Sequence, residues 1–357
     1  MDNKDIIINI IFIVLRREFK INEFRTPLIP SEIKILKNNN FIVYVEKCNV
    51  RHFKNNEYEE VGAIMIDDYT KENLDKNKTI IIGLKELDIN NEEHFKYKQM
   101  YFSHTYKGQE NSELILKKFK QINGIIFDLE YFVDIENNFK RKIAFGFYAG
   151  VIGCYLGILQ FYHKLLGIND VNNIKKFTSF DELLLSLNFI NKIIIKPKIS
   201  IIGINGRCGN GAKFILDKLN LKYNGLTRES DKSNLLENDI IINCIFLNNK
   251  YIEPFVTQNQ INNHDKNLVI VDVSCDYTNK FNPFPIYNKN STFENPVIKI
   301  NNLVDLISID NLPTLLPNES SVEFSNKLIN IILDVNKNTN YWNYNIDLFF
   351  TIIKNIS

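Results

Sequence analysis

Two side chains that can carry protons stand where apolar runs of the sequence end. Lys85 follows the run Thr-Ile-Ile-Ile-Gly at 79–83, and His104 follows Met-Tyr-Phe-Ser at 100–103. A lysine that is partly removed from water has a lowered pKa and can serve as a general base, and a histidine exchanges protons near neutral pH. The two residues are candidates for acid–base chemistry, and a solvated lysine and an ordinary histidine are the alternative.

Three further cations have the chemistry to bind carboxylates. Arg25 precedes a Thr-Pro pair, and Lys140 and Arg141 are adjacent in a later polar stretch. A guanidinium group can hold a carboxylate through two parallel hydrogen bonds, and an ammonium group holds it as a point charge. Taken singly, each of these residues is more typical of a charged surface.

A glycine cluster follows an apolar run at 199–202 and precedes a helical pattern. It has the spacing G-x-x-G-x-x-G with one more glycine behind it, and it consists of Gly203, Gly206, Gly209 and Gly211. A strand, a tight turn and a helix in this order direct backbone N–H groups at the pyrophosphate of a dinucleotide. Because the spacing departs from the commoner G-x-G-x-x-G, a glycine-rich turn without a ligand is the alternative.

The identity of the dinucleotide depends on an acid beyond this turn. A carboxylate about 20 residues further on binds the adenosine ribose and favours NAD. Glu229 stands at that distance from Gly209, with Asp231 as a second candidate. Arg228 precedes Glu229 and could instead receive the 2′-phosphate of NADP. The sequence predicts NAD and leaves NADP open.

The pattern of the chain supplies a scaffold for these residues. Short β-branched runs alternate with helical stretches, so we expect strands at 6–15, 41–46, 63–66, 79–83, 100–103, 124–127, 199–202, 239–246 and 268–273, and helices at 31–37, 143–162, 320–335 and 341–355. This alternation is typical of parallel α/β sheets, in which ligands bind beyond the carboxyl ends of the strands. Arg25, Lys85 and His104 are therefore expected to cluster.

The length of 357 residues is sufficient for two domains with a sizeable core. We expect an α/β protein with two Rossmann-like domains, each a mostly parallel sheet flanked by helices, and an active site in the cleft between them. Residues 1–142 and 321–357 would form the substrate-side domain, and residues 143–320 the dinucleotide-binding domain. Within the latter, 143–167 would be an interdomain helix, and the polar stretch at about 168–196 is interpreted as a linker.

Composition excludes several classes of function. A net charge of +1 argues against nucleic acid and anionic membranes as partners. The stretch 143–162 has twenty positions without a charge, close to the ~20 that span a bilayer, but its glycines and Gln160 favour a buried helix.

The five cysteines are scattered and contain no C-x-x-C pair, which predicts a reducing compartment and no metal site. Cys208 and Cys244 could form a redox pair, although two small buried side chains are the preferred interpretation. We expect a cytoplasmic protein, a monomer, that acts on small molecules.

Several stretches together resemble saccharopine dehydrogenases of the lysine-forming type, which are relatives of alanine dehydrogenase and of the transhydrogenase nucleotide-binding subunit. The matching stretches are Ile-Ile-Ile-Gly-Leu-Lys-Glu at 80–86 and those at 102–109, 127–130, 144–150, 203–211, 242–245, 272–287 and 307–317. They follow the order of the family over nearly the whole chain, and the match weakens between about 165 and 195 and after 335.

The resemblance implies a reaction. Saccharopine, NAD and water would give lysine, 2-oxoglutarate and NADH, the last step of the α-aminoadipate route to lysine. Lys85 matches the family's catalytic lysine, which removes a proton from the substrate amine, and His104 matches the second acid–base group. The alternatives are a related amino-acid or opine dehydrogenase and a catalytically retired homologue that serves as a binding module.

The resemblance also assigns binding residues. The substrate positions are Arg25, Lys107, Gln109, Glu130 and Arg141, with Glu130 matching an acid beside the catalytic lysine. The cofactor positions are Lys140, Gly203, Gly206, Arg207, Gly209, Glu229, Ser233, Phe246, Val273, Ile309, Asp310, Asn311 and Leu312. Three of these depart from the family pattern: Lys140 replaces an arginine, Asn311 a histidine and Phe246 a tyrosine.

Overall fold

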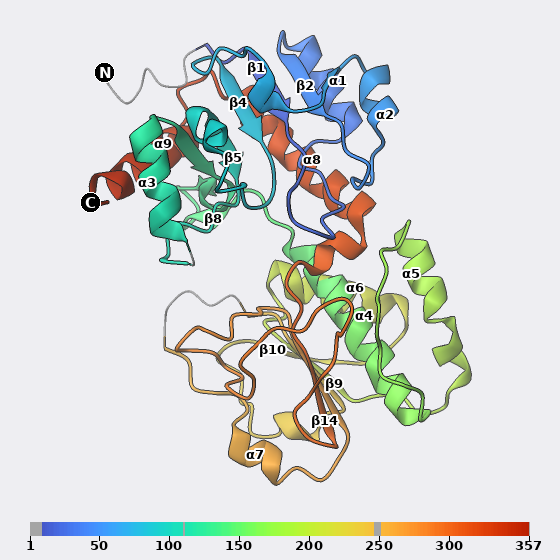
Figure 1. Cartoon of the computed structure of the whole chain (residues 1–357). Coiled ribbons are helices and arrows are strands. Elements are labelled where there is room, and N and C mark those ends of the chain that lie inside the picture. The colour runs from blue at the N-terminus through green and yellow to red at the C-terminus, as the bar shows by residue number, and fades with distance from the viewer. Residues whose placement is uncertain (1–8, 110, 246–250, 357) are drawn as a thin grey trace. The chain divides into compact units, whose positions relative to one another are not determined.

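The chain forms two compact units in the computed structural model, which describes residues 9–109, 111–245 and 251–356 (Figure 1). The first unit consists of Met1–Ala144 and Pro317–Ser357, and the second of Phe145–Leu316. The first unit therefore contains both ends of the chain. Each unit is built around its own six-stranded sheet.

All six strands of the first unit's sheet run parallel. They are β1 (Phe12–Leu15), β2 (Ile42–Glu46), β3 (Ile64–Ile66), β4 (Thr79–Ile82), β5 (Lys98–Tyr101) and β6 (Ile125–Asp128). Their order is β3-β2-β1-β4-β5-β6, so β1 pairs with β2 on one side and with β4 on the other. The strand order reverses between β1 and β4, and in such sheets the crevice at this point is where ligands bind.

Helices cover the first sheet and include the end of the chain. They are α1 (Pro30–Asn38), α2 (Asn55–Glu60), α3 (Ser112–Ile122), α8 (Pro317–Leu333) and α9 (Asn340–Lys354). The last two return to the first unit, where α8 packs on α1 and α9 packs on β6 and α3 (Figure 1). The two expected C-terminal helices are thus confirmed. A small antiparallel pair, β7 (Val133–Asp134) and β8 (Lys140–Arg141), completes this unit.

The second unit has a mixed sheet with one antiparallel edge. Its strands are β9 (Ile199–Ile202), β10 (Asn224–Leu226), β11 (Ile240–Asn243), β12 (Leu268–Asp272), β13 (Ile298–Lys299) and β14 (Val304–Ile307). They are arranged as β10-β9-β11-β12-β14-β13, and β13 is the antiparallel member. The helices are α4 (Gly146–Leu165), α5 (Phe180–Ser186), α6 (Arg207–Lys218) and α7 (Gln258–Asn262).

The uncharged stretch of the sequence is α4, the central helix of the second unit. Twelve of its residues are buried, and it packs along α6 and against β11 and β12. The predicted buried helix is confirmed. No helix among the described residues has the length and apolar character needed to cross a membrane.

Two predicted segments differ from the structure. The expected strand at 6–15 is shorter, because Asn9 has a left-handed backbone (φ 83°) and β1 begins only at Phe12; residues 6–8 lie outside the described residues. The expected linker at 168–196 contains α5 and a 3₁₀ helix, Asn188–Lys192. Leu183, Leu187 and Ile190 recur at helical spacing and are fully buried in the core of the second unit.

Candidate active site

Lys85 lies at the point where the first sheet reverses its strand order. β1 and β4 end side by side, with Leu15 opposite Ile82, and Lys85 is the third residue beyond β4. The backbone N–H groups of Leu84 and Lys85 donate to the Glu18 carboxylate at 2.7 and 2.9 Å. Lys85 is half-buried and follows the fully buried Leu84.

Arg25 is buried next to this point and is held by an acid that the sequence analysis did not single out. Its Nε and Nη2 donate to the Glu23 carboxylate at 2.8 and 2.6 Å. Glu18, Glu23 and Arg25 line one cavity of about 10 Å³ together with Arg16, which places Arg25 beside the carboxylate that binds the backbone of Lys85. Burial raises the pKa of Glu18; the Arg16 charge opposes this shift, and the Glu23 charge adds to it.

Four other predicted substrate and catalytic residues gather around Glu130. Glu130 forms ion pairs with Lys107 (2.7 Å) and Arg141 (2.5 Å), and Gln109 accepts a hydrogen bond from the backbone of Lys107 at 2.9 Å. Burial raises the pKa of Glu130, but the charges of Arg141, Lys107 and His104 outweigh it, so its pKa lies below the usual value. The expected place of Glu130 beside Lys85 stays a prediction.

His104 stands on a strained backbone between two tethered neighbours. Its φ is +52°, a left-handed conformation that is uncommon for a non-glycine residue. The Ser103 hydroxyl donates to Asp128 at 2.6 Å and lies 2.8 Å from the Thr105 hydroxyl. Because β4 and β5 are neighbours in the sheet, Lys85 and His104 leave it at the same edge.

The glycine turn of the second unit has the shape that a dinucleotide requires. Gly203 has φ +85°, and a Cβ at Gly209 would lie 2.3 Å from the Gly203 carbonyl oxygen, so side chains are excluded from both positions. Gly206 is the N-cap of α6, which begins at Arg207. The N–H groups in the first turn of a helix point out of its end and are suited to a pyrophosphate, so the chain fits the cofactor on backbone geometry.

The other predicted cofactor residues of this unit that the structure describes follow the carboxyl ends of strands in its sheet. Glu229 and Ser233 follow β10, Val273 follows β12, and Ile309, Asp310, Asn311 and Leu312 follow β14. Glu229 is exposed, and Ser233 donates to Asp231.

Two predicted cofactor residues are not part of this arrangement. Lys140 is an exposed residue of β8 in the first unit. Phe246 lies outside the described residues.

Two cysteines meet at this turn. Burial and, to a lesser extent, the neighbouring thiol of Cys208 raise the pKa of Cys244 well above its ordinary value. A thiol with a raised pKa is mostly protonated and unreactive, so at least Cys244 is a small buried side chain, as expected. Among the described residues, no group of three or more His, Cys, Asp or Glu side chains could hold a metal ion.

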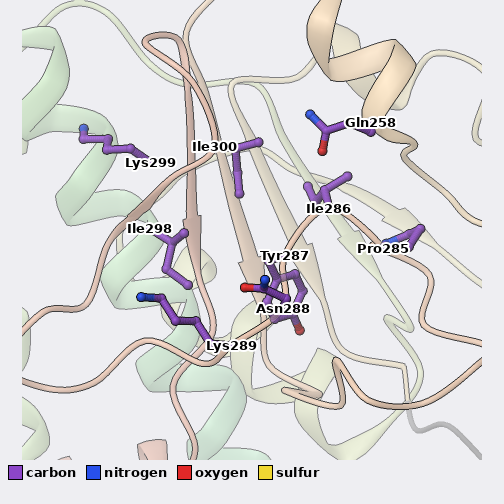
Figure 2. A pocket seen from close by; sticks show the side chains of 9 residues that line it. All are labelled: Gln258, Pro285, Ile286, Tyr287, Asn288, Lys289, Ile298, Lys299 and Ile300. Atoms are coloured by element: carbon purple, nitrogen blue, oxygen red, sulfur yellow. The ribbon is translucent and has the colours of Figure 1, made fainter.

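A cavity of about 410 Å³ lies beside β13, the antiparallel edge strand of the second sheet (Figure 2). It contains none of the predicted site residues. Tyr287 lines it and donates to Asp272 at the end of β12 at 2.7 Å, while Lys299 points away from Tyr287 and pairs with Asp170 and Asp305. The cavity thus adjoins the edge of the sheet, and one of its two lysines, Lys299, is already paired with acids.

Known proteins match this chain in domain composition and in fold. The family model described as alanine dehydrogenase/PNT, N-terminal domain, matches residues 14–152, and the model of the C-terminal domain matches residues 198–349. An L-alanine dehydrogenase structure superposes with a TM-score of 0.71 over 95% of this chain and 94% of its own, at 14% identity. That likeness shows the fold.

Curated relatives are more similar in sequence. The NAD-dependent, L-lysine-forming saccharopine dehydrogenase of Schizosaccharomyces pombe is 36% identical over 89% of this chain and 91% of its own length. The enzyme of the same name from Candida albicans is 34% identical over 90% of this chain and 91% of its own. This chain is therefore an NAD-dependent oxidoreductase and belongs to the family of L-lysine-forming saccharopine dehydrogenases.

Proposed function

We propose that this chain oxidises saccharopine with NAD and water and releases L-lysine, 2-oxoglutarate and NADH, as the last step of the α-aminoadipate route to lysine. The observation that carries the proposal is the 36% identity to a relative with this activity in its name, over 89% of the chain. The charged cluster around Glu130 and the buried Arg25 support it, because saccharopine carries three carboxylates.

The substrate would be bound by cations that the fold already holds in place. Glu23 orients the guanidinium group of Arg25, and Glu130 orients the head groups of Lys107 and Arg141. Cations held rigidly by acids lose little conformational entropy when a carboxylate arrives. Gln109 is held against the backbone of Lys107 and would act beside it.

Two proton transfers fall to this chain's own residues. Lys85 takes the proton from the secondary ammonium group of the substrate, which is needed before the glutaryl carbon can be oxidised. The glycine turn before α6 would hold NAD, which would supply the acceptor for the hydride of that carbon. His104 then moves protons as water adds to the imine and the resulting carbinolamine collapses to amine and ketone.

The first test is NADH formation from saccharopine by the parent protein and by Lys85→Met and His104→Gln. Removal of a general acid or base costs about 10²- to 10⁴-fold in rate, so both variants should lose at least about 100-fold in kcat. Lys78→Met is the matched control, because Lys78 directly precedes β4, the strand that leads to Lys85, and its side chain is 48% exposed. The kcat of this variant should stay within about twofold of the parent value, as expected for a surface position away from the site.

Two results would contradict this assignment. Turnover of alanine but not of saccharopine would favour the related amino-acid dehydrogenase. Near-parental rates in both Lys85→Met and His104→Gln would refute the acid–base roles of these two residues and would leave saccharopine as the proposed substrate.

The choice of NAD over NADP rests on Glu229. This residue follows β10, the strand next to β9 in the sheet, which is where an acid binds the ribose hydroxyls in such folds. Glu229→Ala should raise the KM for NAD by about tenfold, the loss of one charge-assisted hydrogen bond. Glu237→Ala is the control, because Glu237 is an exposed acid of the same unit and is not among the predicted site residues. A lower KM for NADP than for NAD in the parent would refute the choice.

We also propose a cytoplasmic monomer. Each of the five cysteines is a free thiol, which is typical of a reducing compartment. Sedimentation of the purified protein tests the monomer, and a mass of two chains would contradict it.

A further inference from the structure

A buried ion pair that follows the end of β1 forms hydrogen bonds with the backbone of Lys85. The side chains of Arg16 and Glu18 are 0% and 6% exposed and lie 3.3 Å apart. Glu18 accepts hydrogen bonds from Leu84 N (2.7 Å) and Lys85 N (2.9 Å). Arg16 Nη2 donates to the carbonyl oxygen of Lys85. Both polar backbone groups of Lys85 are therefore bonded to one pair of side chains.

The pair binds the backbone of Lys85 beyond the end of the strand. β4 ends at Ile82, and the last backbone bond of this edge runs from Phe102 N to Leu84 O at 3.2 Å. Lys85 lies one residue further, outside the ladder. A buried backbone N–H or C=O without a partner is costly, so another group must satisfy it. Here two charged side chains do so, which fixes the Cα of Lys85 in place.

The sequence around the pair makes room for it. A Cβ at Gly83 would lie 2.3 Å from Arg16 Cζ, so a side chain there would displace the guanidinium group. The rings of Phe19 and Tyr101 lie 5.6 and 5.8 Å from Arg16 Cζ. A buried ion pair is weak evidence for stability, because desolvation offsets the attraction. Its geometry indicates a role in position instead.

We propose that Arg16 and Glu18 are positioning residues that clamp the backbone of Lys85 so that its amine reaches the substrate. The catalytic part of this inference rests on the proposed function of Lys85. The clamp itself rests only on the contacts above. Neither residue touches the reacting atoms.

The test compares Glu18→Gln with Glu46→Gln. A glutamine has a single acceptor oxygen, so one of the two N–H groups bound by Glu18 would lose its partner. Glu46 is the matched control: it ends β2 in the same sheet, is 2% exposed, and accepts from Arg17 N (2.8 Å) and Tyr69 N (2.9 Å). Amide hydrogen exchange, kcat with saccharopine and KM for NAD are measured for each full-length protein.

In Glu18→Gln we expect exchange at Leu84 and Lys85 at least about tenfold faster, kcat at least about tenfold lower, and KM for NAD unchanged, because one bond of the clamp is lost. In Glu46→Gln we expect kcat within about twofold of the parent, as for a residue outside the site. Gly83→Ala displaces Arg16 from the other side and should reproduce the loss of kcat if Glu18→Gln does not fold.

Two outcomes would overturn the clamp. One is unchanged exchange at Leu84 and Lys85 in a folded Glu18→Gln. The other applies if the parent is active. The clamp is then refuted if Lys85→Met loses activity while Glu18→Gln does not, or if Glu46→Gln loses as much activity as Glu18→Gln. If the parent does not oxidise saccharopine, the proposed function fails, and the exchange measurement alone decides whether the clamp exists.

Discussion

The buried residue Asp128 links two segments of the candidate site, and burial changes its pKa. Its side chain accepts from the Ser103 hydroxyl and from the backbone of Glu130, and Asn345 donates to its carbonyl oxygen at 2.9 Å. Burial raises the pKa of Asp128 to about 6, although the hydrogen bonds from Ser103 and Glu130 oppose the shift. The residue thus links the two segments that carry His104 and Glu130.

This shift predicts a dependence of stability on pH. A carboxyl group with a raised pKa binds its proton more tightly in the folded state, so its contribution is present below the unfolded pKa of about 4 and is lost as pH rises through about 6. Asp128→Asn resembles the protonated form and does not lose it. Relative to the parent, this variant should gain about 2–3 kcal/mol of unfolding free energy between pH 4 and pH 7.

Urea unfolding at several pH values between these limits measures the difference. The raised pKa values of Glu18 and Asp272 are present in both proteins, so their effects cancel. Parallel stability curves for the parent and Asp128→Asn would contradict the prediction.

At the scale of elements, α4 and α6 approach each other through glycines. A Cβ at Gly150 would lie 1.9 Å from the carbonyl oxygen of Cys208, and a Cβ at Gly211 would lie 1.9 Å from that of Phe147. The two helices are therefore in backbone contact at the first turns of α6. Since that helix end forms the glycine turn, α4 supports the predicted cofactor site from behind.

Gly150→Ala should destabilise the protein and should weaken binding of the cofactor. An added methyl group in a close-packed contact costs typically about 1–3 kcal/mol, and here it would push the N-terminus of α6 away. Gly146→Ala on the same helix is the control, because its Cβ would meet Arg207 Cβ at 3.4 Å and Cys208 N at 3.8 Å, both ordinary contact distances. Thermal unfolding and NADH titration measure both effects, and equal behaviour of the two variants would refute the argument.

At the scale of the whole molecule, the last helices complete a unit that begins at the other end of the chain. Trp342 on α9 is fully buried, donates to the carbonyl oxygen of Ile331 at 2.9 Å, and meets Phe127 and Phe132 edge-on. Phe127 lies on β6, so the tail covers the strand that leads to Asp128 and Glu130. The C-terminal segment is therefore part of the scaffold of the first unit.

Trp342→Ala should destabilise the protein strongly. Truncation of a buried aromatic side chain costs about 3–5 kcal/mol, since it leaves a cavity. Asp347→Ala on the same helix removes an exposed side chain and should stay within about 0.5 kcal/mol. Urea unfolding followed by far-ultraviolet circular dichroism compares them, and a cost below about 1 kcal/mol for Trp342→Ala would show that the tail is dispensable.

The sequence by itself determined the features that depend on neighbours along the chain. The apolar runs that end before Lys85 and His104, the glycine turn at Gly203 and the buried helix at 143–162 are local patterns, so they could be predicted from residue types and spacing. The strands β2, β4, β11 and β12 lie within one or two residues of the expected bounds, apart from the end of β11, which was expected three residues further on.

The tertiary structure alone decided which side chains meet. Glu18 reaches Lys85 across more than sixty residues only because β1 pairs with β4. Asp128 reaches Ser103 because β5 pairs with β6, and Leu183 is buried because α5 packs on the second core. Strand order and helix packing are set by the burial of many apolar side chains at once, so contacts between distant residues cannot be deduced from a local pattern.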